Sequence, residues 1–242
     1  MPRFFIEAEP VDGLLTIEGA DARHIARVLR MGPGESLVLC NGAGVDFDCV
    51  IEQAGAERIL CRVRGQSPSA GEPRTEVTLY MALPKADKME LVIQKTIELG
   101  VSRIVPFSSA RCVARPDASG RKALRWQKIA AEAAKQCGRG RIPEVAGVIP
   151  FEEAVREAAL AETALFFYEC ERERSLRSVL QGRPLRTVSL MIGAEGGFSL
   201  EEAREAGAGG LISVSLGKRI LRCETAPLAA LAAVMYESGN LE

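Results

Sequence analysis

The 242-residue sequence predicts an α/β protein in which a small, mostly β domain precedes a larger α/β domain. Three observations predict this class. After residue 75, short apolar runs alternate with helical periodicity, which favours a parallel sheet covered by helices. Before residue 66, short strand-like runs are separated by turn signals such as Asn41-Gly42, which is typical of a small β-barrel. Late in the chain, two strands each run into a glycine-bearing loop and then a helix, a unit typical of parallel α/β sheets.

In the first domain the sequence predicts four strands and one helix. The strands are expected at residues 14–17, 36–39, 45–51 and 59–63. Asp21 is the expected N-cap of the helix, and Ile25, Val28 and Leu29 form its expected apolar face. The segment 66–74 is rich in Pro, Gly and Ser, so we expect the boundary between the domains there.

The second domain is expected to alternate strands with helices. Strands are predicted at residues 77–83, 104–107, 164–168, 187–192 and 211–216. Helices are predicted at residues 91–99, around Trp126, and at 151–160, 200–206 and 226–236. The apolar stretch 227–235 suits either a buried core helix or a helix in a subunit interface.

The two glycine-bearing loops are the most informative part of the sequence. They read Ile-Gly-Ala-Glu-Gly-Gly-Phe-Ser at 192–199 and Leu-Gly-Lys-Arg-Ile-Leu-Arg-Cys-Glu-Thr-Ala at 216–226. Both are expected at the carboxyl edge of the parallel sheet, where small ligands bind in such folds. Glycine lets a ligand approach the backbone closely, although for a single isolated loop a tight turn is the favoured interpretation. Two of them, one with the charged cluster at 222–224, indicate a binding site.

Composition excludes several classes of protein. Hydrophobic residues make up 47% of the chain and charged residues 26%, as in an ordinary folded domain. There is no apolar run of transmembrane length and no signal-peptide pattern, so a cytoplasmic location away from membranes is expected. The seven cysteines are scattered without a C-x-x-C pair, so neither a disulfide framework nor a metal site is expected.

Charge is distributed unevenly although the net charge is only −1. Residues 85–143 carry thirteen Lys or Arg against five Asp or Glu, a local net of +8. Residues 144–175 carry three Arg against eight acids, a net of −5, and residues 1–74 carry eight basic against eleven acidic residues, a net of −3. This asymmetry is what a one-faced nucleic-acid surface requires, and a solvated face explains it equally well.

Nearly the whole chain resembles one family. The two loop motifs resemble those of SPOUT-class methyltransferases of the RsmE type. Further matching segments follow in the family's order: Arg3-Phe-Phe5, residues 24–30, Lys85, residues 94–100, Arg111, residues 132–139 and Pro143. One departure is Ala194, which stands where the family usually has proline.

The resemblance implies a function and an architecture. RsmE enzymes transfer a methyl group from S-adenosylmethionine to N3 of a uridine in small-subunit ribosomal RNA. Residues 1–70 would form a PUA-like β-barrel that binds RNA, and residues 75–242 a SPOUT α/β-knot methyltransferase domain. The last strands and helix would be threaded as a trefoil knot around the cofactor. Expected partners are small-subunit ribosomal RNA, free or in the assembled subunit, and a second copy of the chain in a homodimer.

Site residues follow from the matching positions and from the charge pattern. By resemblance, the cofactor would be lined by Gly193, Glu195, Gly196, Leu216, Gly217, Ile220, Leu221, Thr225 and Ala226. RNA contacts are expected from Arg3, Arg23, Arg27, Arg30, Lys85, Arg111, Arg115, Gln136 and Arg139, most of them to phosphates. Gln136 and Arg139 are expected one helical turn apart, on one face and nearer the target base.

Methylation at N3 requires the loss of a proton, so a general base should lie within hydrogen-bond reach. Glu195 and Glu224 are the candidates near the expected pocket, and the choice between them stays open. Arg222 is assigned to orientation or to stabilising the N3 anion, since arginine keeps its charge. A structural ion pair between Arg222 and Glu224 is an alternative of equal weight. The only histidine, His24, lies in the first domain, far from the loops in sequence.

Other functions remain in competition. One is a ribose 2′-O RNA methyltransferase of the same superfamily, which the position of the methyl group on the product would distinguish. Another is a non-catalytic RNA-binding assembly factor, which would bind RNA without binding the cofactor. A dinucleotide-dependent oxidoreductase is disfavoured because no G-x-G-x-x-G opens the first strand–helix unit.

Overall fold

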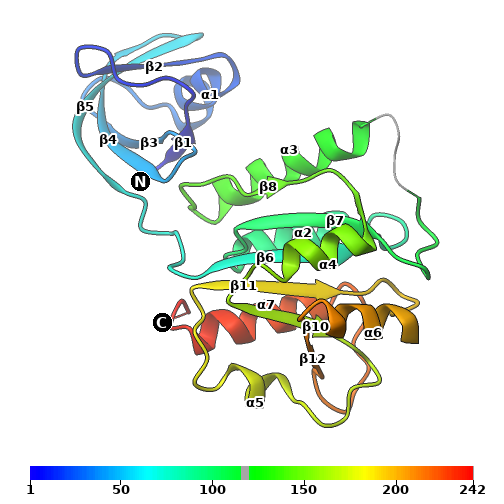
Figure 1. Cartoon of the computed structure of the whole chain (residues 1–242). Helices are drawn as coiled ribbons and strands as arrows, with labels where there is room; N and C mark the ends of the chain where they lie inside the picture. The colour runs from blue at the N-terminus through cyan, green and yellow to red at the C-terminus, as the bar shows by residue number, and fades with distance from the viewer. Residues whose placement is uncertain (116–119, 242) are drawn as a thin grey trace. The chain divides into compact units, whose positions relative to one another are not determined.

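Two units, each with its own sheet, make up the chain in the computed structural model, which describes residues 1–115 and 120–241 (Figure 1). The first unit consists of Met1–Glu72 and Ala134–Ile142, and the second of the remaining described residues. No helix within these described residues is long and apolar enough to cross a membrane.

The first unit is built on a five-stranded sheet in the order β1-β3-β4-β5-β2. Its strands are β1 (Arg3–Phe5), β2 (Leu14–Glu18), β3 (Ser36–Cys40), β4 (Val45–Ala54) and β5 (Arg58–Pro68). Along β4, Phe47, Cys49 and Ile51 alternate inward, as period-2 patterning requires. Two irregularities in the β4–β5 register bend these long strands, which lets the sheet curve around its core. The predicted small β-barrel is thereby confirmed as a curved half-barrel.

The helix of the first unit differs from the expectation. A short α-helix, α1 (Gly19–Arg23), passes into a π-helical segment, η1 (His24–Leu29). Asp21 lies inside α1, and Glu18 occupies the N-cap position instead. Ile25 is fully buried as predicted, but Val28 and Leu29 are exposed. The predicted apolar face was wrong because the wider π turn breaks the 3.6-residue period on which that face was based.

Residues 134–142 complete the first unit through a buried polar contact. Arg139 is 4% exposed, and its guanidinium pairs with Glu72 at 2.8 Å between Nη2 and Oε2. The other Glu72 oxygen accepts the backbone N–H groups of Gly140 and Arg141 at 2.8 and 2.9 Å. Burial raises the pKa of Glu72, but these hydrogen bonds and the guanidinium charge outweigh burial and hold its pKa below the usual value.

The second unit contains a parallel sheet in the order β12-β10-β11-β6-β7-β8, with β9 also paired to β7. Its strands are β6 (Glu76–Ala82), β7 (Arg103–Ser108), β8 (Glu144–Val145), β9 (Ile149–Pro150), β10 (Thr163–Phe167), β11 (Thr187–Ile192) and β12 (Ile212–Val214). Nearly continuous apolar runs in β10 and β11 reflect burial on both faces of the sheet. The predicted parallel α/β sheet is confirmed, and the trefoil knot stays a prediction.

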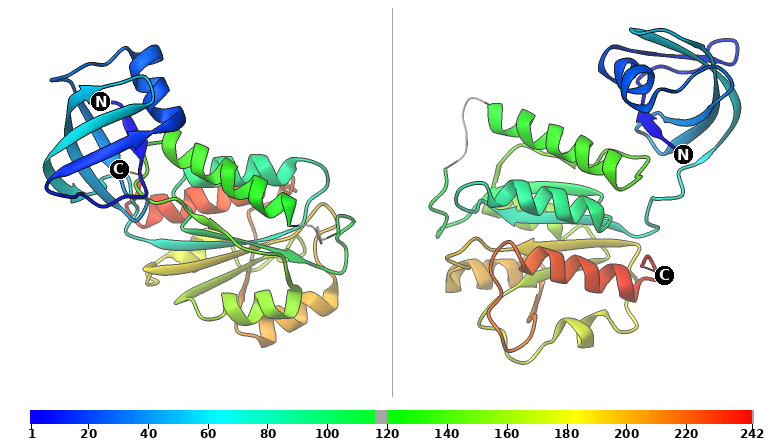
Figure 2. Two further views of the ribbon diagram at one scale, coloured as in Figure 1. Left: turned by 90° about the horizontal axis from the view of Figure 1, so that it is seen from above. Right: turned by 180° about the vertical axis from the view of Figure 1, so that it is seen from behind.

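Helices cover both faces of this sheet. They are α2 (Lys88–Glu98), α3 (Arg121–Gln136), α4 (Phe151–Ala158), α5 (Leu176–Leu180), α6 (Leu200–Ala208) and α7 (Ala226–Glu237). Figure 2 shows α4 and α6 on one face and α2 and α7 on the other. Ser199 starts α6 with a capping box, accepting the Glu202 N–H while the Glu202 carboxylate accepts the Ser199 N–H.

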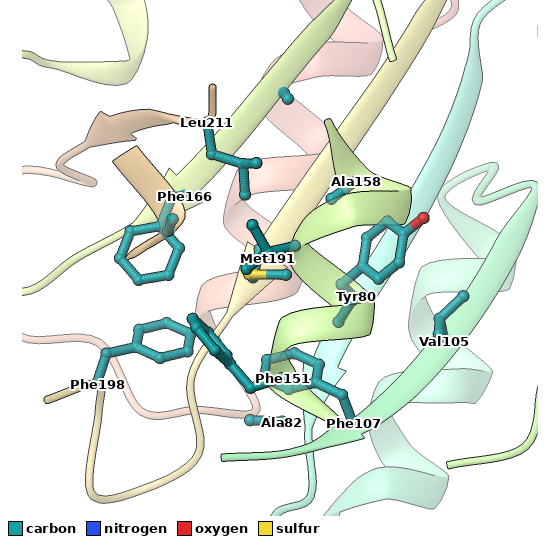
Figure 3. Close-up of a cluster of buried hydrophobic side chains, with 14 of the residues drawn as sticks. Tyr80, Ala82, Val105, Phe107, Phe151, Ala158, Phe166, Met191, Phe198 and Leu211 are labelled. Atoms are coloured by element: carbon teal, nitrogen blue, oxygen red, sulfur yellow. The ribbon is translucent and has the colours of Figure 1, made fainter. Parts of the chain in front are cut away.

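An aromatic cluster fixes the start of α6 against the sheet (Figure 3). Phe198 is 1% exposed, and its ring centroid lies 4.3 Å from that of Phe166 on β10. The Phe198 ring also stacks parallel to that of Phe107 at 6.3 Å and contacts Phe151 at 6.0 Å. Because Phe198 directly follows the first glycine loop, one end of that loop is anchored in the core.

Candidate functional site

A pocket of about 360 Å³ opens where three neighbouring strands of the parallel sheet end. Its walls come from residues 167–169 at the end of β10, 192–197 at the end of β11, and 214–217 and 219–223 at the end of β12, with Lys88 of α2 and Ala226 of α7. The order β12-β10-β11 places the end of β10 between the two glycine loops. The pocket therefore lies at the sheet edge predicted from the sequence.

Eight of the nine residues expected to contact a cofactor line this pocket: Gly193, Glu195, Gly196, Leu216, Gly217, Ile220, Leu221 and Ala226. Thr225 does not line it and instead occupies the N-cap position of α7. Ile220 is 73% exposed, so its side chain is available at the pocket wall rather than packed in the core.

Glycine is required at specific points of the first loop. Gly197 has a φ of +61°, which L side chains rarely adopt. A Cβ at Gly197 would overlap the Glu169 carboxylate, and a Cβ at Gly196 would lie 2.9 Å from the Cβ of Arg111. The Arg111 guanidinium also donates to the Gly196 carbonyl at 3.1 Å. These contacts explain the glycine pair between Glu195 and Phe198.

Lys88 joins the two glycine loops at the pocket wall. Its ammonium lies 3.0 Å from Oε1 of Glu195 in the first loop and 3.1 Å from Oε2 of Glu224 in the second. The backbone N–H of Lys85 also donates to Glu195, at 3.2 Å to Oε1. The Lys88, Glu195 and Glu224 side chains are 29%, 28% and 20% exposed, so this cluster is open to the pocket rather than sealed.

The cluster carries one surplus negative charge at neutral pH. Hydrogen bonds to Glu195 and Glu224 raise the pKa of Lys88, which stays protonated. Burial raises the pKa of Glu195, but hydrogen bonds from its own N–H, Lys88 and Lys85 outweigh this and lower it. The pKa of Glu224 is lowered by its own backbone N–H, by the Cys223 thiol and by Lys88. Burial, with the Glu224 hydrogen bond, raises the pKa of Cys223 to about 12, so that thiol is neutral.

Arg222 lines the pocket with an exposed side chain. Glu224 pairs with Lys88, and no ion pair forms between Arg222 and Glu224, although both lie in the described part of the chain. The alternative of a structural Arg222–Glu224 pair was therefore wrong, because the α2 lysine reaches Glu224 instead. Arg219 adds a second arginine to the same wall.

Sequence reasoning missed part of the pocket. Lys88, Tyr168 and Glu169 line it but were not assigned to it. Tyr168 and Glu169 carried a usable signal, since Tyr168 ends the predicted strand 164–168 and Glu169 directly follows it, and the carboxyl end of that strand belongs at the same edge. Lys88 carried none, because its role depends on how α2 lies against two loops more than 100 residues later. Within residues 1–115 and 120–241, no group of three or more His, Cys, Asp or Glu could hold a metal ion.

The residues expected to contact RNA fall into two sets. Those with an exposed side chain are Arg23, Arg27, Arg30, Lys85, Arg111, Arg115 and Gln136, although Arg23 pairs with Glu57 at 2.6 Å. Arg3 and Arg139 are occupied inside the first unit, by Asp46 and Glu72 respectively. Arg139 also lies beyond the end of α3 at Gln136, so the two do not share a helix face as expected. Its burial argues against a direct phosphate contact.

The fold and the pocket define an α/β protein with a cavity of small-ligand size where parallel strands end, and with a separate half-barrel unit. Residues 71–235 match the family model described as an RNA methyltransferase domain, and residues 17–64 match that of an RNA methyltransferase PUA domain. The first of these matches covers well over half of the chain.

Individual relatives agree over the full length. The chain is 31% identical to ribosomal RNA small subunit methyltransferase E of Bacillus subtilis (strain 168), covering 98% of this chain and 97% of that protein. It also matches the crystal structure of a ribosomal RNA small subunit methyltransferase E from Neisseria gonorrhoeae bound to S-adenosyl methionine. That match has a TM-score of 0.86 at 32% identity and covers 98% and 97% of the two chains. A putative methyltransferase from Legionella pneumophila with bound cofactor SAM matches with a TM-score of 0.82 at 34% identity, covering 97% and 96%. The chain belongs to the RsmE family of RNA methyltransferases.

Proposed function

We propose that this protein methylates N3 of a uridine in small-subunit ribosomal RNA with S-adenosylmethionine as the methyl donor. The observation that carries the proposal is the pocket itself. In a chain of the RsmE family, both predicted glycine loops meet at one sheet edge and enclose a cavity there. Relatives of similar length and fold hold S-adenosyl methionine, which supports the same ligand for this pocket.

The residues present suit this cofactor. Leu216, Ile220 and Leu221 offer an apolar wall for adenine, while the glycine loops expose main-chain donors and acceptors that can read its polar edge. The surplus negative charge of the Lys88 cluster suits the cationic end of the molecule. When bound, the cofactor supplies an electrophilic methyl group on a sulfonium. The protein's own contribution is positioning and electrostatics.

We assign the loss of the N3 proton to one of two glutamates as the base and to one arginine that stabilises the resulting anion. Glu195 and Glu224 are both ionised and able to accept a proton, and the choice of base stays open between them. Hydrogen bonds from their own backbone N–H groups, and the Lys88 ammonium, lower their pKa values and so weaken them as bases. We therefore assign the larger effect to stabilisation of the N3 anion by Arg222, a permanent cation at the pocket wall.

We assign RNA binding to the domain of residues 1–70 and methyl transfer to residues 75–242, the latter threaded as a trefoil knot. The exposed arginines of the first domain and Lys85, Arg111 and Arg115 of the second would contact phosphates. The substrate is the free RNA or the assembled small subunit, and the working form is a homodimer. A ribosomal substrate favours a cytoplasmic location.

The test is methyl transfer from labelled S-adenosylmethionine to unmodified small-subunit RNA and to assembled small subunits. The product nucleoside is identified by mass spectrometry, and 3-methyluridine is expected. A ribose-methylated nucleoside would instead assign the chain to the 2′-O class. Tight RNA binding without any transfer or cofactor binding would make it an RNA-binding assembly factor.

A further inference from the structure

Two carboxylates line the pocket, Glu169 and Glu195, and a third, Glu224, pairs with the pocket-lining Lys88. Glu195 and Glu224 both pair with Lys88. Glu169 also lines the pocket and is partly buried. Within the described residues its carboxylate accepts no hydrogen bond and forms no ion pair, although its main-chain carbonyl accepts a bond from Arg172 at 3.0 Å. A partly buried carboxylate without a donor has unused capacity for two or more hydrogen bonds.

The topology places Glu169 between the two glycine loops. It follows β10, the strand flanked by β11 and β12, and these two strands lead into the loops. The Glu169 carboxylate lies against Gly197, where a Cβ would overlap it. The glycine therefore does more than permit the +61° turn, since it also leaves room for the carboxylate beside the first loop.

We infer that the Glu169 carboxylate accepts hydrogen bonds from the vicinal hydroxyls of the cofactor ribose and selects a ribonucleoside. This inference rests on the proposed function. S-adenosylmethionine carries three kinds of donor: the adenine amino group, the ribose hydroxyls and the ammonium. Main-chain groups of the glycine loops suit the amino group, and the surplus charge of the Lys88 cluster suits the ammonium. The hydroxyl pair is the donor that remains for Glu169, and two carboxylate oxygens match two adjacent hydroxyls.

The same arrangement has a physical parallel in dinucleotide-binding sheets. There an acidic residue near a glycine-rich loop binds a ribose hydroxyl while the loop lies against the rest of the nucleotide. Glu169 has a similar position, because it lies at the carboxyl end of a parallel strand and next to a glycine loop. The chemistry is general, because a hydroxyl donates well to an ionised acceptor.

The test is calorimetric binding of S-adenosylhomocysteine, its 2′-deoxy and 3′-deoxy counterparts, and 5′-methylthioadenosine, which lacks the amino-acid part. Wild type is compared with Glu169→Ala and Glu169→Gln. Glu173→Gln is the matched control, since it removes a charge from the same connecting segment without touching the pocket. Thermal unfolding of each variant shows that the fold is retained.

Glu169→Ala is expected to weaken S-adenosylhomocysteine and 5′-methylthioadenosine alike, by about 10- to 100-fold, as for hydrogen bonds to a charged group. The affinity of Glu169→Gln for both compounds should lie between that of Glu169→Ala and that of wild type. Wild type should bind the 2′-deoxy and 3′-deoxy compounds more weakly than S-adenosylhomocysteine. In Glu169→Ala this difference in affinity should vanish.

Two results overturn the inference while leaving the proposed function intact. One is equal binding of the ribose and deoxyribose compounds by wild type. The other is a Glu169→Ala variant that loses S-adenosylhomocysteine but keeps 5′-methylthioadenosine, which would assign the carboxylate to the ammonium. If wild type binds none of these nucleosides, the proposed function falls and the inference falls with it.

Discussion

The two units each contain an ion-pair cluster that joins segments far apart in sequence, but the clusters differ in access. In the first unit Arg139 and Glu72 have side chains 5% and 16% exposed, and both carboxylate oxygens of Glu72 have partners within the unit. In the second unit Lys88 is 29% exposed and faces two carboxylates beside a cavity. The buried Arg139–Glu72 pair therefore stabilises its unit. The Lys88 cluster, which is partly exposed and has one excess negative charge, instead forms part of a candidate ligand site.

The largest expected effect comes from breaking the sealed cluster. Glu72→Ala removes the carboxylate from a buried guanidinium and from two backbone N–H groups, which should destabilise the first unit by about 3–5 kcal/mol. The measurement is denaturant unfolding followed by a probe in the first unit. The control is Glu57→Ala, which breaks the exposed pair with Arg23 and should cost about 0–1 kcal/mol. Equal effects of the two variants would contradict the distinction drawn between sealed and open pairs.

Filling the cavity beside the open cluster should abolish ligand binding without unfolding the chain. Gly196→Trp places an indole in the pocket, next to Arg111, and no binding of S-adenosylmethionine should be measurable by calorimetry. RNA affinity should stay largely intact. Gly207→Trp is the control, because Gly207 is exposed on α6 with nothing near its Cβ position. Unchanged cofactor affinity in Gly196→Trp would refute the placement of the pocket.

Removing the cation of the open cluster should change both rate and pH dependence. Lys88→Met leaves two carboxylates without their shared ammonium, so the pKa of at least one should rise. We expect methyl transfer to fall by about 10- to 100-fold, in line with the loss of an electrostatic contact in an active site. The acidic limb of the pH–rate profile should also move to higher pH. Lys95→Met, which breaks the Lys95–Glu98 pair on the outer surface of α2, should change neither. A pH–rate profile of wild-type shape in Lys88→Met would show that the Lys88 cluster does not take part in catalysis.

The smallest expected effect is an acid dependence of stability. The folded-state pKa of Glu72 lies below its unfolded value, so its contribution is fully present above the unfolded pKa of about 4.3. That contribution is lost as the pH falls through the lower folded value. Unfolding curves between about pH 6 and pH 3 should show a shallower loss of stability in Glu72→Gln than in wild type. Parallel curves for the two proteins would mean that folding does not lower the pKa of Glu72.

The sequence correctly predicted those elements that are determined by residues close together in the chain. The strands around 77–83 and 187–192 and the glycine loops carry their signals within a few residues, and the structure places them where they were expected. The short strands β8 and β9 and the helix α5 were not anticipated, because two to five residues are too few to show a period.

What sequence missed depends on contacts between distant segments. Residues 134–142 join the first unit through Glu72, more than 60 residues earlier, and nothing in their composition distinguishes them from a loop of the second domain. The π-helical η1 was missed for a related reason, since its apolar residues match an ordinary α-helical period. Lys88 lies before the helix predicted at 91–99, and only the packing of α2, which begins at Lys88, brings it to Glu224.

The anchoring of Phe198 in the aromatic cluster has a consequence for the motion of the ligand site. The Gly197 N–H donates to the Ala194 carbonyl at 3.0 Å, and the next residue is held by rings from three other segments. Opening this loop would require Phe198 to leave the core, so the amide of Gly197 should exchange its hydrogen only through large-scale opening of the second unit. The first glycine loop is thus held at its Phe198 end before any ligand arrives, so we expect binding there to incur little loss of loop entropy.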